Sequence, residues 1–125
     1  NQYADPVVLA DKDRMMQVLN NLLTNAIKYS PNSSKIIVEV KEKDDKAIIS
    51  VQDFGIGIPG EDKDKVFERF FRVSGKQEST FPGFGIGLYI VKEIVSMHNG
   101  QVWVESEKGK GSTFYISLPC VQAIK

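Results

Sequence analysis

The sequence predicts a single α+β domain, a two-layer sandwich in which helices cover one face of a mixed, mostly antiparallel β-sheet. Two segments carry apolar residues at helical spacing, and four segments rich in β-branched or aromatic residues pair into two hairpins. The length of 125 residues and the hydrophobic content of 42% fit one compact domain over residues 1–125.

The first half of the chain predicts a helix followed by a hairpin. The helix begins at Asp11, a suitable N-cap, and ends near Ser30. Its apolar residues, three or four positions apart, are Met15, Leu19, Leu22, Leu23 and Ala26. β-branched residues then predict strands over 35–41 and 46–52, joined by a polar turn at 42–45.

The middle of the chain has weaker signals. Pro59 and the glycine after it break the strand pattern, and residues 63–71 predict a short helix. Residues 73–82 have no hydrophobic period, so we expect a mobile loop there.

The last third repeats the order of helix and hairpin. Residues 86–98 predict a second long helix, which ends at the Asn99-Gly dipeptide. Residues 101–106 and 112–118 alternate apolar and polar positions around a glycine-containing turn at 109–111. This pattern predicts the second hairpin.

The composition argues against several classes of protein. Lys plus Arg and Asp plus Glu both number 16, so no net charge attracts nucleic acid or anionic lipid. Cys120 is the only cysteine, which excludes an internal disulfide and favours a reducing compartment. No apolar run approaches the roughly 20 residues that span a bilayer. We therefore expect a cytoplasmic location without direct membrane contact, and anchoring of a longer parent in the bacterial inner membrane stays open.

The polar face of the first helix carries the sharpest chemical signal. At about 100° per residue, Asn21, Asn25 and Lys28 fall opposite the apolar stripe. Asn and Thr are poor helix formers, so their concentration over residues 20–25 needs a reason. A solvated face is the simpler explanation for any one Asn. The functional alternative is an amide oxygen that coordinates Mg²⁺, with the lysine one turn further on neutralising a phosphate.

Two glycine-rich segments predict the rest of a nucleotide site. Asp53 ends a strand and enters Gly55-Ile-Gly57, where the backbone can approach a flat ligand and the carboxylate can accept from an exocyclic amine such as that of adenine. The three glycines within residues 83–87 lead into the second helix, whose N-terminus suits a di- or triphosphate. A plain turn and a glycine hinge are the simpler explanations for each segment alone. Their order in the chain favours ATP binding.

Other nucleotide motifs fit these segments poorly. Residues 55–60 match the dinucleotide fingerprint in spacing, but they contain Pro59 and no alternating β-α-β series follows. Asp53-Phe-Gly lacks the other protein-kinase motifs, and Gly75-Lys lacks the flanking residues of a P-loop.

Five ordered segments together resemble the catalytic and ATP-binding domain of two-component sensor histidine kinases. This family shares the Bergerat ATP-binding fold with gyrase, the heat-shock chaperone ATPases and the mismatch-repair ATPases. The similarity extends over residues 11–119. Its segments are an N box at 13–31, a first glycine box at 53–59, an F box at 67–72, a second glycine box at 83–88 and a closing segment at 109–114.

The resemblance implies roles for the matching positions of the N box and the first glycine box. Asn25 would bind Mg²⁺ with Asn21 beside it, and Lys28 would contact phosphate. Tyr29 would lie against the ribose or adenine, and Asp53 would accept from the adenine amine. Hydrolytic members of the superfamily have a Glu at the position of Asn21, and an amide cannot take a proton at neutral pH. We therefore expect little ATP hydrolysis and transfer of the γ-phosphoryl group to a protein side chain.

The resemblance also implies roles in the other boxes. Arg72 would stabilise charge near the γ-phosphate as a catalytic residue, together with Asn21, and Thr113 would support the base through water. The positions that would shape the base site or the phosphate-facing lid are Gly55, Gly57, Ile58, Gly85, Gly87 and Leu88. The aromatic residues expected in the core instead of against ligand are Phe67, Phe70, Phe71 and Trp103.

The resemblance implies partners as well. Sensor kinases phosphorylate a histidine on a separate dimerisation domain and pass the group to a response regulator receiver domain. His98, the only histidine, lacks the expected neighbours and sits at a helix end, where it would interact with the helix dipole. We therefore expect a monomeric chain without its phosphoacceptor domain and without the helix that usually opens this fold, from a homodimeric parent.

Two other functions stay open. A stand-alone serine kinase would share the fold but usually lacks the F box at residues 67–72. A degenerate module would bind nucleotide without transfer, which the intact boxes disfavour. We expect nucleic acid to have no part in any of these functions.

Overall fold

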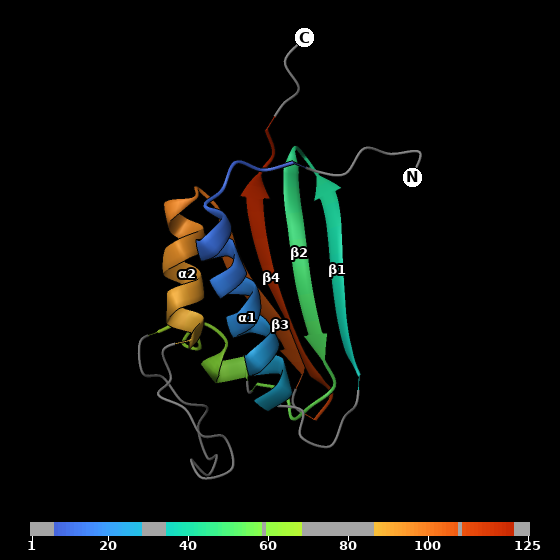
Figure 1. Cartoon of the computed structure of the whole chain (residues 1–125). Helices are drawn as coiled ribbons and strands as arrows, with labels where there is room; N and C mark the ends of the chain where they lie inside the picture. Colours follow the sequence, from blue (N-terminus) through green and yellow to red (C-terminus); the bar gives the residue numbers. More distant parts are fainter. Residues whose placement is uncertain (1–6, 29–34, 59, 69–86, 108, 122–125) are drawn as a thin grey trace.

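A computed structural model describes residues 7–28, 35–58, 60–68, 87–107 and 109–121. Within them, two helices form one layer and a four-stranded sheet forms the other (Figure 1). The elements are α1 (Lys12–Lys28), β1 (Ile36–Lys43), β2 (Lys46–Asp53), the 3-10 turn η1 (Gly60–Asp62), α2 (Gly87–Met97), β3 (Gln101–Glu107) and β4 (Gly111–Pro119). Neither α-helix has the length and apolar character needed to cross a membrane, as far as the described residues extend.

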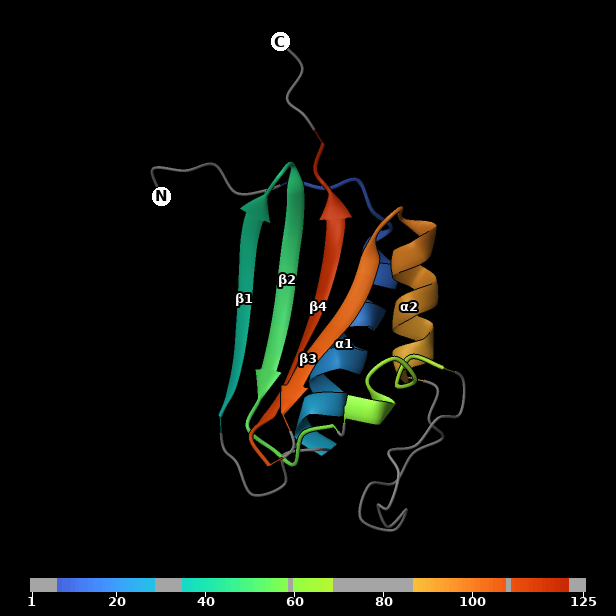
Figure 2. The ribbon, with the colours of Figure 1, turned by 180° about the vertical axis from the view of Figure 1, so that it is seen from behind.

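The sheet has the strand order β1-β2-β4-β3, and each neighbouring pair is antiparallel. Both predicted hairpins form, and the pairing of β2 with β4 joins them, with Ile49 opposite Ile116. Helices α1 and α2 lie over one face, and the view from behind shows the strands in front of both helices (Figure 2). The α+β prediction is thereby confirmed.

The first hairpin closes with two residues, not with the four that were predicted. Lys43 pairs with Lys46, so Asp44 and Asp45 alone form the turn. Their φ angles are 54° and 63°, which places both in the left-handed region. Two such residues in succession are typical of a type I′ turn, whose twist matches that of the flanking strands.

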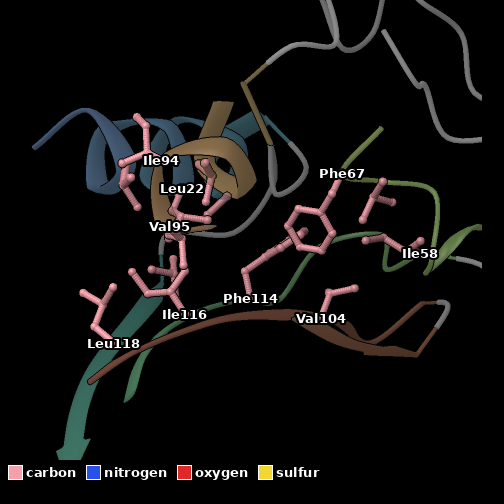
Figure 3. Close-up of a cluster of buried hydrophobic side chains, with 14 residues drawn as sticks. Leu22, Ile58, Phe67, Ile94, Val95, Val104, Phe114, Ile116 and Leu118 are labelled. Carbon is pink, nitrogen blue, oxygen red and sulfur yellow. The ribbon is translucent and has the colours of Figure 1, made fainter. Parts of the chain in front are cut away.

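The core lies between the helices and β2, β3 and β4. On α1 most of the predicted apolar stripe is confirmed, because Leu22 and Ala26 are fully buried and Met15 and Leu23 pack against the core. Val18, which was not predicted, is also fully buried, whereas Leu19 is not part of the core. Figure 3 shows Leu22 of α1 and Val95 of α2 above the sheet residues Phe114 and Ile116. The helices do not cover β1, where Val38 and Val40 remain 51% and 56% exposed. The core is therefore centred on β4.

Phe67 belongs to this core, as predicted. Its ring meets that of Phe114 edge to face, with centroids 6.1 Å apart and planes at 85° (Figure 3). Phe70 and Phe71 lie outside the described residues.

Trp103 lies on the opposite face of the sheet, which corrects its predicted core position. Its neighbours Val102 and Val104 pack toward the helices, so the alternation of a strand turns Trp103 away from them. There it stacks on Tyr115, with ring centroids 5.1 Å apart and planes 6° from parallel. The hydroxyl of Tyr115 donates a hydrogen bond to Glu105 at 2.9 Å.

Residues 63–68 form turns, so the short helix predicted over 63–71 is wrong for this part, and residues 69–71 are not described. The backbone N-H groups of Lys63, Lys65 and Glu68 each bond to the carbonyl three positions back, not four. Tight turns of this kind bury two successive apolar side chains, Val66 and Phe67. The loop predicted over 73–82 lies outside the described residues.

Helix α2 ends as predicted at the Asn99-Gly100 dipeptide. Asn99 has a φ of 62°, and its N-H donates to Ser96 O at 3.0 Å. The N-H of Gly100 donates to Val95 O at 2.9 Å, which completes a Schellman motif. A Cβ on Gly100 would lie 2.2 Å from the carbonyl oxygen of Ser117, so glycine is needed here for close approach to β4.

Candidate functional site

The predicted site residues gather at one end of the domain. The last turn of α1, the end of β2, the start of α2 and the β3-β4 turn all lie at the lower end in Figure 1. An antiparallel sheet covered by two helices thus brings segments together there that are more than 60 residues apart in the chain.

Asp53 is the central acidic residue of this end. It is the last residue of β2, faces the helix layer, and is only 1% exposed. Its Oδ1 accepts hydrogen bonds from the backbone N-H groups of Gly55 at 3.0 Å and Ser112 at 3.2 Å. Its Oδ2 is buried and has no hydrogen-bond partner among the described residues. A buried carboxylate oxygen without a partner is costly, so this atom is suited to accept from a ligand.

Burial also changes the acidity of Asp53. Removal from water raises the pKa of its carboxyl above the ordinary value of 3.8, while the hydrogen bonds from Gly55 and Ser112 act in the opposite direction. The burial effect is the larger. Such perturbation in a buried acid at a strand end is typical of functional sites.

The loop after β2 is held against the β3-β4 hairpin. Gly57 has a φ of 74°, which lets the chain turn immediately after the strand. The N-H of Gly109 donates to Ile56 O at 2.8 Å, and the N-H of Ile58 donates to Ser106 Oγ at 2.7 Å. A Cβ on Gly111 would lie 2.2 Å from the carbonyl oxygen of Asp53, so the two segments approach as closely as backbones can.

Asn21 and Asn25 lie one turn apart on α1. Asn21 Nδ2 donates to the carbonyl oxygen of Gly87 at 3.2 Å, which ties the middle of α1 to the first residue of α2. One turn further on, Asn25 Nδ2 is buried without a hydrogen-bond partner among the described residues. Lys28 is the last residue of α1. The predicted grouping of Asn21 and Asn25 on one side of α1 is therefore present, but this side adjoins the buried residues Leu22 and Ala26 and does not lie opposite them.

Several predicted site residues lie elsewhere than beside Asp53 or cannot be placed. Ile58 is buried in the core, and Leu88 packs against the core from α2. Thr113 pairs with Gln52 and Glu105, and strand alternation turns it to the face of the sheet away from the helices. The residues that lie outside the described part of the chain are Tyr29, Arg72 and Gly85.

Two serines at this end were not predicted. Ser112 donates its backbone N-H to Asp53, and its side chain contacts that of Ser106 at 2.8 Å. The sequence pattern that could have predicted the position of Ser112 is the alternation of β4. Side chains two positions apart in a strand share a face, so Ser112 lies on the same face as the buried Phe114.

The side chains at this end would suit a metal ion that is bound mainly by phosphate and water and by few protein atoms. No group of three or more His, Cys, Asp or Glu side chains that could hold a metal ion occurs in the described residues. Mg²⁺ does not require such a group of side chains, because it is commonly bound by one or two protein oxygens together with phosphates and water. The side-chain oxygen of Asn25 is a ligand of the right type for this arrangement.

Sequence comparison places this chain among ATPases. A sequence profile described as histidine kinase-, DNA gyrase B-, and HSP90-like ATPase matches residues 10–122. The sensor histidine kinase WalK of Bacillus subtilis (strain 168) is 44% identical over 117 residues, and the sensor protein kinase WalK of Staphylococcus aureus is 43% identical over 112 residues. These alignments cover 92% and 88% of this chain but 19% and 27% of the relatives. The chain thus spans less than a third of these curated relatives.

Structural comparison gives the same grouping. The mycobacterial sensor histidine kinase MprB superposes with a TM-score of 0.83 at 33% identity, covering 93% of this chain and 78% of that one. Full-length ShkA, solved in complex with AMPPNP, superposes with a TM-score of 0.80 at 29% identity, covering 96% and 24%. The nucleotide-free catalytic domain of the histidine kinase ThkA superposes with a TM-score of 0.75 at 34% identity, covering 90% and 71%.

Proposed function

Because this chain belongs to the family of histidine kinase-, DNA gyrase B- and HSP90-like ATPases, we propose that it is the catalytic domain of a sensor histidine kinase. In this role it binds Mg-ATP and transfers the γ-phosphoryl group to a histidine on a separate dimerisation domain. A response regulator receiver domain is the next acceptor. The proposed location is the cytoplasm, with a homodimeric parent and this chain alone as a monomer.

The observation that carries the nucleotide assignment is the Oδ2 of Asp53, which has no hydrogen-bond partner among the described residues. It is buried at a strand end, and its companion Oδ1 is held in place by two backbone donors. An adenine amine would supply the missing hydrogen bond. Because the carboxylate is fixed before the ligand arrives, binding needs little reorganisation of the side chain.

The amides of α1 support the phosphate end of the proposal. Asn25 would give its side-chain oxygen to Mg²⁺, and its Nδ2 is buried without a hydrogen-bond partner among the described residues. Lys28, at the end of the same helix, would neutralise phosphate charge. Arg72 of the F box would stabilise the charge that develops during transfer.

Transfer to protein is favoured over hydrolysis by the side chain at position 21. Asn21 is an amide whose Nδ2 is engaged with Gly87 O, and an amide cannot remove a proton from water at neutral pH. The chain therefore holds the phosphoryl group for an acceptor supplied from elsewhere.

Calorimetric titration with ADP and ATP tests the nucleotide site. We expect wild type to bind both, and Asp53→Asn to lose at least about tenfold in affinity, since a charge-assisted acceptor becomes a donor. Asp45→Asn, an equivalent change in the β1-β2 turn at the other end of the sheet, should bind like wild type. Equal affinities of Asp53→Asn and wild type would contradict the assignment.

Phosphotransfer is tested by incubating the chain with labelled ATP and a separately supplied dimerisation domain. We expect label on the supplied domain, lost on acid treatment as phosphohistidine is, and none on this chain alone. Acid-stable label would support a serine kinase. Nucleotide binding without any transfer would support the interaction module instead.

A further inference from the structure

We propose that Ser106 is a positioning residue of the nucleotide site. It fixes the loop after β2 and directs the hydroxyl of Ser112 so that the base-binding end accepts hydrogen bonds and does not donate them. The inference rests on the proposed function, because it concerns how the same site selects its purine base.

The side chain of Ser106 joins three segments. Residue 106 follows Val104 on the face of β3 that packs toward the helices. Its Oγ lies 2.7 Å from the backbone nitrogen of Ile58, 3.0 Å from the carbonyl oxygen of Gly111 and 2.8 Å from Ser112 Oγ. The loop after β2, β3 and the start of β4 therefore meet at one hydroxyl group.

Hydrogen-bond accounting at this hydroxyl fixes the direction of each contact. A serine hydroxyl has one hydrogen to donate and two lone pairs to accept with. The N-H of Ile58 uses one lone pair, and the carbonyl oxygen of Gly111, which can only accept, takes the hydrogen. The contact with Ser112 must then use the second lone pair, so Ser112 is the donor.

This direction determines what Ser112 offers to a ligand. Its hydrogen is spent on Ser106, so its Oγ keeps two lone pairs and has no hydrogen left to donate. Ser112 also donates its backbone N-H to Asp53 Oδ1 at 3.2 Å, which places it next to the carboxylate. Asp53 Oδ2 is a further acceptor, and no described residue donates a hydrogen bond to it. Both side chains thus offer acceptors at this end of the site.

An acceptor that faces the exocyclic group at ring position 6, as Asp53 Oδ2 would, discriminates between purines that bind in the same pose. Adenine has an exocyclic amine that donates, whereas guanine has a carbonyl oxygen at the same ring position. In that pose the guanine carbonyl would face Asp53 Oδ2 and leave this oxygen unpaired, and unpaired buried polar groups are the strongest basis for rejecting a close analogue. Ser106 contributes to this selection without touching the base.

Ser106 also holds the loop in place. The β3-β4 hairpin binds it at two points, through Gly109 N-H to Ile56 O at 2.8 Å and through Ser106 Oγ to the N-H of Ile58. Ser106→Ala removes the second point and leaves the N-H of Ile58 without that acceptor. The first point is backbone to backbone and survives the change.

The test compares ADP and GDP dissociation constants by calorimetry for wild type, Ser106→Ala and Ser106→Thr. We expect Ser106→Ala to lose about tenfold in ADP affinity and to reduce the preference for ADP over GDP. Ser106→Thr, which keeps the hydroxyl, should restore both to within about twofold of wild type. Ser117→Ala is the matched control, since Ser117 is buried on β4 where that strand pairs with the start of β3, at the other end of the sheet.

A second measurement separates positioning from a general loss of stability. Hydrogen exchange at the Ile58 amide should become faster in Ser106→Ala and stay unchanged in Ser117→Ala. Should Ser106→Ala not fold, Ser106→Cys takes its place, because a thiol forms only weak hydrogen bonds. A wild-type ADP to GDP ratio in the folded variant would overturn the inference alone. Failure of wild type to bind ADP would instead overturn the proposed function.

Discussion

The imidazole of His98 joins the two helices, because its Nε2 accepts a hydrogen bond from the backbone N-H of Asp11 at 3.0 Å. Its Nδ1 lies 2.8 Å from the carbonyl oxygen of Ile94, which can only accept, so Nδ1 carries the proton. Asp11 in turn caps α1 by accepting from the N-H of Arg14 at 3.1 Å. Both nitrogens of the only histidine are thus used within the domain.

Replacement of His98 should destabilise the domain. His98→Ala removes the acceptor of the Asp11 N-H and the link between the end of α2 and the start of α1. We expect a loss of about 1–2 kcal/mol in the free energy of unfolding, measured by urea denaturation. Met97→Ala, one residue earlier and 77% exposed, should change it by less than about 0.5 kcal/mol. Equal effects of the two variants would exclude the link.

The buried carboxyl of Asp53 should make stability depend on pH. Its pKa is raised in the folded state, so the folded protein holds this proton at pH values where the unfolded chain has already released it. Stability therefore falls as pH rises from 3.8 through the raised pKa and is then constant with respect to this group.

Asp53→Asn resembles the neutral acid and removes this dependence. We expect the free energy of unfolding of Asp53→Asn, relative to wild type, to increase as pH rises above 3.8 and to level off once the pH exceeds the raised pKa of Asp53. Urea denaturation of both proteins across this range gives the difference directly. A difference that decreases with pH would mean that the pKa of Asp53 is lowered.

The β1-β2 turn offers a stabilising change far from the site. Asp44 and Asp45 have φ angles of 54° and 63°, which Asn and Gly adopt more readily. The double change Asp44→Asn with Asp45→Gly should raise the free energy of unfolding by about 0.5–1 kcal/mol and leave ADP affinity unchanged. Asp45→Val should lower it, because a β-branched residue is strained at positive φ. A change in the free energy of unfolding with the same sign in the double variant and in Asp45→Val would contradict the turn geometry.

Gly100 should not tolerate a side chain. A Cβ there would lie 2.2 Å from Ser117 O and 2.8 Å from Val95 Cγ1, so α2 and β4 would have to separate. We expect Gly100→Ala to cost about 2 kcal/mol or more by thermal or urea unfolding. A Cβ on Gly60 would meet nothing within 4 Å, so Gly60→Ala is the control and should be close to neutral.

Removal of Mg²⁺ should weaken ATP binding through Asn25. With a chelator present, wild type should lose at least about tenfold in ATP affinity, because the cation neutralises the phosphates. Asn25→Ala should bind ATP weakly and with little response to Mg²⁺. Asn20→Ala, on the exposed face of the same helix, should keep the wild-type response. A full Mg²⁺ response in Asn25→Ala would remove Asn25 as the ligand.

The sequence by itself determined the features that depend on neighbouring residues. The period of α1, the Asn99-Gly100 stop of α2 and the alternation of the hairpins are local properties, and all three appear in the structure. The position of Asp53 at a strand end was also predictable, because an abrupt change from β-branched residues to glycines marks that end.

Only the tertiary structure decided which side chains share a face. Trp103 is of a residue type common in cores, but the helices cover the other side of β3. Successive side chains of a strand point to opposite faces, so a shift of one position decides between them. The same alternation places Ser112, not Thr113, beside Asp53. Ser106 acquires its contacts from Ile58, 48 residues earlier, and a pairing at that separation has no signature in local sequence. The contact forms because the β3-β4 hairpin packs against the loop after β2.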